Sequence, residues 1–168
     1  MKKAIAFLFL ILFSLTCYSA YAETNSQVIV LVSFVKETQP QFALRNSATG
    51  DIGSSLVYST DAIYKDDVTA SFEIVQTNTS LCSGVVSLSV KATELVAKKN
   101  NKYYTTSGLN IIENGTNLGS SAEFTLNYNG YRVPENTVVK TFDVKWYSNP
   151  NLVKANYEAA ILLNYMVY

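Results

Sequence analysis

Apolar and polar positions alternate along several segments of this chain, with the two-residue period of a β-strand. In Thr69–Gln76, for example, Ala70, Phe72 and Ile74 share one face, while mostly polar residues occupy the other. One buried apolar face and one solvent-exposed polar face are typical of antiparallel sheets that pack as a sandwich. The pattern predicts an all-β chain, with strands at Val28–Val35, Gln41–Arg45, Ser54–Ser59, Thr69–Gln76, Val85–Ala92, Tyr103–Thr105, Ala122–Tyr128, Val138–Trp146 and Asn156–Val167.

Asparagine, glycine and proline mark the turns between these segments. Asn129-Gly130 has the composition of a two-residue hairpin turn, and Asn114-Gly115 predicts another turn. Ser148-Asn149-Pro150-Asn151 predicts a proline turn that leads into the final strand. The one helical candidate is Ala92–Lys99, which also fits the continuation of a strand. The spacing of turns, with no repeat or linker, indicates a single domain.

The first and last predicted strands are the most apolar. The last carries an alternating apolar face, and the sequence ends within this strand, at Tyr168. That face consists of Tyr157, Ala159, Ile161, Leu163, Tyr165 and Val167. The first strand is apolar on both faces, with Val28, Val30, Val32 and Phe34 on one and Ile29, Leu31, Ser33 and Val35 on the other.

A strand that is apolar on both sides requires burial on both sides. Val28–Val35 therefore has two interpretations. It is the first strand of its own sandwich, or it leaves its own domain and completes a neighbouring subunit by β-strand addition. Composition by itself favours the first interpretation.

The first 22 residues have the organisation of a signal peptide. Lys2 and Lys3 precede a short apolar segment, Ala4–Leu15, and Ala20-Tyr21-Ala22 supplies small residues for cleavage before Glu23. Removal of 22 of the 168 residues leaves 146, enough for one domain with a core. The remaining 11 basic and 13 acidic residues give a net charge near −2, which argues against nucleic acid as a partner.

Several classes of chemistry find no support in the sequence. The chain contains no histidine, which excludes Ser-His-Asp and Cys-His nucleophilic schemes and histidine metal ligands. Asp66-Asp67, with Asp61 nearby, matches no cation-binding loop and is interpreted as a solvated turn. Cys17 lies in the leader, so Cys82 has no disulfide partner, and burial is expected for it. We expect no enzymatic activity, cofactor or metal.

Aromatic residues offer the alternative functional interpretation. A sugar-stacking surface would define a monomeric secreted β-sandwich that binds carbohydrate, whereas packing in the core and across strands explains most of these rings equally well. The candidate rings are Tyr103, Tyr104, Tyr128, Tyr131, Trp146 and Tyr147.

Several of these segments resemble a known family. Asn156-Tyr157 followed by an alternating apolar strand is similar to the last strand of chaperone–usher pilins. Leu56-Val57-Tyr58-Ser59 after a glycine turn, and Val68–Thr77 leading into Asn78, are similar to the central region of class 5 (α-type) enterobacterial colonisation-factor pilins. The leader, the valine-rich N-terminal strand and the mature length also fit this family.

The resemblance implies an immunoglobulin-like sandwich that lacks its final strand and is completed by a donor strand from a neighbouring subunit. Residues 1–22 would be the signal peptide, 23–36 the donor segment and 37–168 the incomplete domain. The implied donor residues are Val28, Val30, Val32 and Phe34, and the acceptor edge is formed by Tyr157, Ala159, Ile161, Leu163, Tyr165 and Val167.

The same resemblance implies a place and a set of partners. The chain would be exported through the periplasm to the bacterial surface as a subunit of a fimbria that supports adhesion to host cells. Its partners would be copies of itself or other pilins, a periplasmic chaperone and an outer-membrane usher, with a host glycan or protein receptor as a further partner.

Overall fold

The computed structural model describes residues 39–61, 66–106 and 109–168, which contain β-strands and no helix. The strands are β1 (Phe42–Asn46), β2 (Ile52–Gly53), β3 (Ser55–Thr60), β4 (Val68–Gln76), β5 (Ser80–Ala92), β6 (Leu95–Lys99), β7 (Lys102–Thr106), β8 (Leu109–Glu113), β9 (Thr116–Asn117), β10 (Ser121–Val133), β11 (Val138–Trp146) and β12 (Tyr157–Val167). The all-β prediction is confirmed. The predicted signal peptide, residues 1–22, and the predicted donor segment, residues 23–36, lie outside the described residues.

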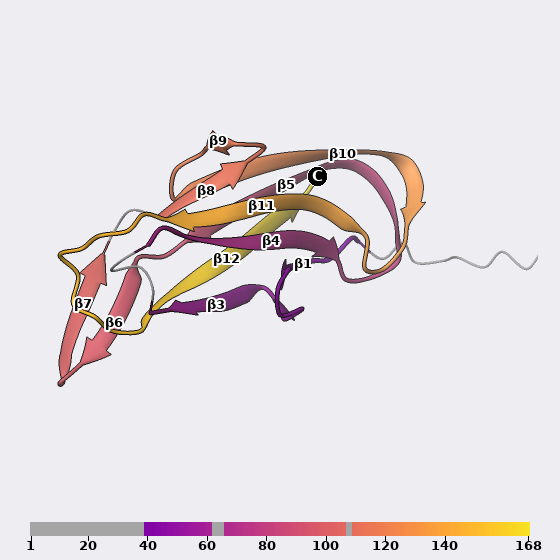
Figure 1. Cartoon of the computed structure of the whole chain (residues 1–168). Helices are drawn as coiled ribbons and strands as arrows, with labels where there is room; N and C mark the ends of the chain where they lie inside the picture. Colours follow the sequence, from indigo (N-terminus) through magenta and orange to yellow (C-terminus); the bar gives the residue numbers. More distant parts are fainter. Residues whose placement is uncertain (1–38, 62–65, 107–108) are drawn as a thin grey trace, which may run out of the picture. The chain divides into compact units, whose positions relative to one another are not determined.

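The strands form two antiparallel sheets (Figure 1). One sheet has the order β2-β1-β4-β11-β8-β9. The other has the order β10-β5-β12-β6-β7, and β3 joins it by pairing with β12. Ala92–Lys99 is not helical: β5 ends at Ala92, and Leu95–Lys99 is β6.

Alternating side chains of the two sheets meet in one hydrophobic core. Phe124 of β10 and Phe142 of β11 pack across the sheets with ring centroids 6.2 Å apart. The largest fully buried apolar side chains are Trp146, Tyr157, Phe72, Leu44, Ile74, Leu88, Leu95, Ile111, Ile161 and Val75. An all-β fold with two sheets around a shared apolar core is consistent with a β-sandwich.

Two of the turn predictions are correct. Asn114 and Gly115 both have positive φ (48° and 80°) and connect β8 to β9. The N–H of Leu152 donates to the carbonyl of Asn149 (3.0 Å), which closes a turn around Pro150 before β12. Turns with positive φ at both central residues suit glycine, which has no Cβ atom, and asparagine, which tolerates the left-handed conformation.

The hairpin predicted at Asn129-Gly130 is wrong. β10 continues through this dipeptide and pairs with β5 on both sides of it, with a shift of register between Asn129 and Tyr131. Gly130 has φ +75°, whereas Asn129 is not among the residues with positive φ. The dipeptide therefore forms a β-bulge, in which glycine accommodates one extra residue without reversing the chain.

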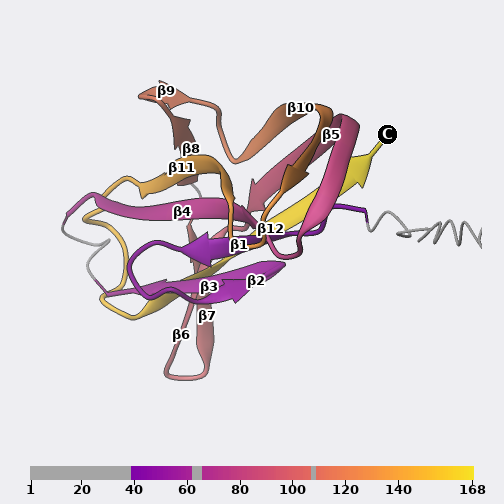
Figure 2. The ribbon, with the colours of Figure 1, turned by 90° about the vertical axis from the view of Figure 1, so that its right-hand side faces the viewer.

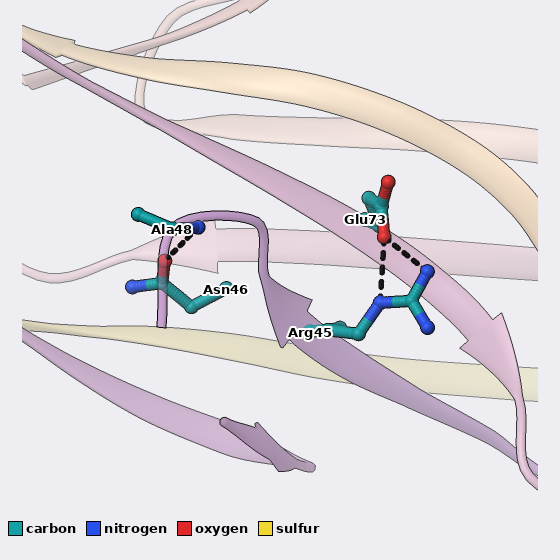
Figure 3. Close-up of polar contacts among 4 residues, drawn as sticks. All are labelled: Arg45, Asn46, Ala48 and Glu73. Atoms are coloured by element: carbon teal, nitrogen blue, oxygen red, sulfur yellow. Dashed lines mark hydrogen bonds and ion pairs between the residues drawn. The ribbon is translucent and has the colours of Figure 1, made fainter. Parts of the chain in front are cut away.

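The turn from β1 to β2 is fixed by its own side chains (Figure 3). Asn46 Oδ1 accepts a hydrogen bond from the N–H of Ala48 (2.9 Å). One residue earlier, the guanidinium of Arg45 forms an ion pair with Glu73 of β4, and Nε of Arg45 lies 2.6 Å from the same carboxylate oxygen. The Arg45–Glu73 pair adds to the backbone pairing of β1 with β4. Phe42, at the start of β1, is buried in the core.

Candidate functional site

The two sides of β12 are paired over different lengths. On one side, Tyr157–Leu162 pair with β3, and the N–H of Leu163 donates to the carbonyl of Ser54 (3.0 Å). On the other side, Glu158 pairs with Val96 of β6, and Ile161–Val167 pair with β5. Beyond Leu163, no strand in the described part of the chain pairs with β12 on its β3 side. The second half of β12 is therefore a sheet edge.

The direction of the backbone groups follows from the antiparallel pairing. The N–H of Leu163 points toward β3, and the N–H of Tyr168, five residues later, donates to the carbonyl of Val85 in β5 (2.9 Å). Because successive residues of a strand direct these groups to opposite sides, Tyr165 and Val167 present their N–H and carbonyl groups on the side away from β5. These are the backbone groups of the open edge.

The side chains of β12 change in burial at the same point. Tyr157, Ala159, Ile161 and Leu163 are buried. Tyr165 belongs to the same core-facing row, yet 41% of its surface is exposed. Its ring contacts Phe42 of β1 edge to face, with centroids 5.2 Å apart. The core is thus well covered along the first half of β12 and less covered along the second.

The six predicted acceptor residues therefore lie on one face of one strand, as the alternation predicts. Four are buried, Val167 is partly buried against the core, and Tyr165 is half-exposed. Sequence reasoning missed Phe42, the ring that Tyr165 contacts across the two sheets. This contact joins distant segments, so no local pattern in the sequence could reveal it.

The end of β12 is held close to β5. Gly84 has φ +88°, and a Cβ atom at this position would lie 2.6 Å from the carbonyl oxygen of Tyr168. Glycine is required here for two reasons: the positive φ, and the close approach of the Tyr168 carbonyl. Gly84 therefore allows the last residue of the sequence to lie against β5.

Cys82 is 1% exposed, so the predicted burial is confirmed. Its Sγ lies 3.1 Å from Oγ of Ser80 and 3.6 Å from Oε1 of Gln76, and both of these neighbours are also buried. Nearby, the hydroxyl of Tyr128 is buried with no hydrogen-bond partner among the described residues. Burial, together with the charges of Cys82 and Tyr131, raises the pKa of Tyr128 to about 12. This polar cluster is enclosed and has a structural role.

Asp67, in the acidic segment near Asp61, contacts residues of the β11 end of the sheet. The N–H of Ser148 donates to Oδ1 of Asp67 (2.8 Å), and Nζ of Lys145 lies 3.3 Å from Oδ2. The hydrogen bond and then the ammonium group lower the pKa of Asp67 below its usual value. Within the described residues, no group of three or more carboxylate or thiol side chains is placed to hold a metal ion.

The aromatic residues that could form a sugar-binding surface are divided between the core and several exposed positions. Trp146 is fully buried and stacks on Tyr58 with centroids 4.5 Å apart, and Tyr128 is also buried. The rings of Tyr103, Tyr131 and Tyr147 are exposed, on or beside different strands. The largest ring is therefore part of the core.

Over the described residues, no helix is long and apolar enough to serve as a membrane span. No protein-family model matches the chain, and a comparison with curated proteins gives no match. The half-open strand β12 is accordingly the feature with the clearest functional consequence.

Proposed function

We propose that this chain is a structural subunit of a bacterial surface fimbria, assembled by the chaperone–usher route through donor-strand exchange. In this proposal the domain is an immunoglobulin-like sandwich without its final strand. The N-terminal segment of a neighbouring subunit, residues 23–36, supplies that strand. The fimbria supports adhesion to host cells.

The observation that supports the proposal is the unequal pairing of β12. Its first half pairs with β3 on one side and with β6 and the end of β5 on the other, whereas Tyr165 and Val167 have backbone groups directed to a side where the described residues provide no strand. An unpaired edge beside a partly exposed core binds an added strand through backbone hydrogen bonds, and pockets receive alternate side chains. The second half of β12 combines an unpaired backbone edge with a partly exposed core.

The proposed donor segment has the composition that this edge requires. Val28, Val30, Val32 and Phe34 form one continuous apolar face. Burial of four such side chains contributes about 1.5–3 kcal/mol each, on the order of 6–12 kcal/mol before the cost of ordering the segment. This amount is comparable with the whole stability of a small domain, so exchange of the donor strand would decide whether the subunit is folded.

The exposed apolar edge also accounts for the order in which partners would bind. A subunit with an open apolar edge aggregates unless that edge is covered. A periplasmic chaperone would cover β12 first, and the N-terminal segment of the next subunit would replace it at an outer-membrane usher. The acceptor row would be the core-facing residues of β12, from Tyr157 to Val167. Of these, Tyr165 and Val167 lie on the open part of the edge, whereas β3 already pairs with the strand up to Leu162.

Thermal melting of three forms of the chain tests the proposal. The first is residues 23–168, the second lacks residues 23–36, and the third carries residues 23–36 after Tyr168 through a short flexible linker. A matched control consists of residues 37–168 followed by the same linker, without residues 23–36. We expect the third form to be a stable monomer with the highest Tm, because its strand returns along the open side of β12.

The deletion and the linker-only control are expected to unfold at lower temperature or to aggregate. The proposal fails if residues 23–168 already form a stable monomer and moving the segment does not raise the Tm. The segment would then pair within its own chain, and the monomeric carbohydrate-binding sandwich would be the better interpretation.

A further inference from the structure

The hairpin β6–β7 extends away from the rest of its sheet (Figures 1 and 2). Its strands, Leu95–Lys99 and Lys102–Thr106, are joined by Asn100 and Asn101 alone. Both asparagines have positive φ (50° and 57°), the conformation of a tight two-residue hairpin turn. The residues of the tip, from Lys98 to Tyr103, are all exposed.

The turn brings three lysines together at this tip. Lys99 pairs directly with Lys102 across the hairpin, and Lys98 pairs with Tyr103. Nζ of Lys99 donates to the main-chain carbonyl of Lys154 (2.8 Å), in the loop before β12. Because neighbouring residues of a strand face opposite sides, Lys99 and Lys102 lie on one face of the hairpin, and Lys98 lies with Tyr103 on the other. The tip is therefore basic on both faces, and the hydrogen bond of Lys99 ties it to the loop before β12.

The three lysines of the hairpin have no acidic counterpart in the described part of the chain, where the ion pairs of Arg45, Lys140 and Lys145 lie elsewhere. Like charges directly opposite each other on paired strands destabilise a sheet, so the juxtaposition of Lys99 and Lys102 lowers the stability of the hairpin. Residues 23–168 contain more acids than bases, yet three of their eleven basic residues lie at this one tip. A local excess of positive charge on a net-negative chain attracts anionic groups.

An aromatic ring accompanies the lysines. Tyr103 is 70% exposed, and Nζ of Lys98 lies 5.6 Å from the centre of its ring. An exposed tyrosine offers a flat apolar face with a polar edge, which suits the face of a sugar ring, and the adjacent ammonium groups suit sulfate or carboxylate substituents. A purely acidic peptide would use the lysines and leave the ring without a role.

We propose that the tip of the β6–β7 hairpin binds an anionic glycan. Tyr103 packs against a sugar ring, and Lys98 on the same face contacts its sulfate or carboxylate group. A glycan that passes over the two-residue turn then meets Lys99 and Lys102 on the other face. This site is independent of the edge of β12 and of strand exchange. It gives the subunit a receptor-binding surface of its own, in addition to a role in assembly.

Binding of residues 23–168 to immobilised oligosaccharides tests the proposal. The probes are a heparin-type sulfated hexasaccharide, its desulfated form, which retains the carboxylates, a neutral maltohexaose, and polyglutamate as an acidic peptide. The test variant is Lys98→Gln/Lys102→Gln. It leaves Lys99 in place, because the ammonium of Lys99 holds the carbonyl of Lys154. The matched control is Lys91→Gln/Arg132→Gln, which removes two exposed positive charges elsewhere on the same sheet.

We expect one or both anionic hexasaccharides to bind and maltohexaose not to bind. The affinity should fall by about tenfold or more in the test variant and by less than about twofold in the control. Tyr103→Leu should weaken the glycan severalfold and leave polyglutamate unchanged. Binding to the sulfated hexasaccharide alone would identify sulfate as the group that is recognised. Equal binding to both hexasaccharides would identify the carboxylate. Melting curves of all variants exclude loss of fold as the cause.

Three results would overturn the proposal. Absence of binding to either anionic hexasaccharide would identify the lysines as a solvated hairpin tip. Equal loss in the test and control variants would identify a general charge effect without a site. Polyglutamate that binds as tightly as the glycans and is insensitive to Tyr103→Leu would assign the tip to an acidic protein surface instead.

Discussion

The ring of Tyr165 meets the ring of Phe42 edge to face, with centroids 5.2 Å apart. This contact links the last strand of one sheet to β1 of the other. Phe42 is buried, whereas Tyr165 keeps 41% of its surface exposed although it belongs to the core-facing row of β12. Tyr165 therefore covers the core at the place where β12 has no second neighbour among the described residues, and an added strand would have to lie beside this ring.

Amide hydrogen exchange in residues 23–168 should alternate along the end of β12. The amides of Tyr165 and Val167 point to the open side, whereas those of Asn164 and Met166 point to β5. We expect the first two to exchange about a hundredfold faster than the second two, measured by NMR. The difference should disappear in the form that carries residues 23–36 after Tyr168. Equal protection of all four amides in the unaltered chain would contradict an open edge.

The register of the donor segment can be tested in that same rearranged form. Aspartate at both Val30 and Val32 should abolish the gain in Tm, because a buried unpaired carboxylate costs several kcal/mol. Aspartate at Ile29 and Leu31 is the matched control and should lower the Tm much less. A shift of one residue exchanges the two faces of a strand. If the control pair is the more damaging, Ile29, Leu31, Ser33 and Val35 form the inserted face.

Gly84→Ala should destabilise the fold more than Gly130→Ala. Both glycines have positive φ, so alanine at either position costs about 1–2 kcal/mol of conformational strain. At Gly130 nothing lies within 4 Å of a new Cβ, whereas at Gly84 the carbonyl oxygen of Tyr168 lies 2.6 Å away. Urea denaturation should therefore give a larger loss for Gly84→Ala. Equal losses would mean that the end of β12 moves aside at no cost.

Tyr128→Phe should leave stability unchanged or raise it by about 1–2 kcal/mol at pH 7. The hydroxyl of Tyr128 is buried without a partner among the described residues, so its removal relieves a desolvation penalty. Tyr131→Phe, which alters an exposed ring, is the control. Clear destabilisation by Tyr128→Phe, absent in the control, would show that the hydroxyl has a partner.

The same variant predicts a change in pH dependence. The folded-state pKa of Tyr128 is about 12, above the unfolded value of 10. Between these values the unfolded chain has released a proton that the folded chain retains, so the stability from this group is present below pH 10 and falls as the pH rises. The loss reaches about 1.4 kcal/mol per pH unit and should be missing from Tyr128→Phe. Denaturation at about pH 9 and pH 11, on either side of the unfolded-state pKa, measures it, and parallel curves for the two proteins would contradict the assignment.

The strands of this protein were predictable because alternation is a local property. Val138–Trp146 is predicted with the bounds that β11 has, and Phe142, Val144 and Trp146 are buried as the pattern requires. The same reasoning missed β8, Leu109–Glu113, where two adjacent isoleucines interrupt the alternation. Its burial depends on the strands and core around it, which a local window does not contain.

Two asparagine-containing dipeptides show where local reasoning fails. Asn129-Gly130 has the composition of a hairpin turn but forms a bulge, because β5 continues opposite it and pairs on both sides. Asn100-Asn101 does form a hairpin turn, although the residues before it also fit a helical pattern. Composition identifies places where the backbone tolerates positive φ. Whether the chain reverses there depends on the partner strand.

The position of β12 in its sheet also determines when the fold can close. β3 and β5 are neighbours only through β12, which lies between them, and the partner of Thr60 in β3 is Tyr157, far along the chain. During synthesis, β3 must therefore wait until nearly the whole sequence has emerged. Pairing across such long separations makes folding slow, roughly milliseconds to seconds for all-β domains. The order of strands delays closure of the core until the last of them is available.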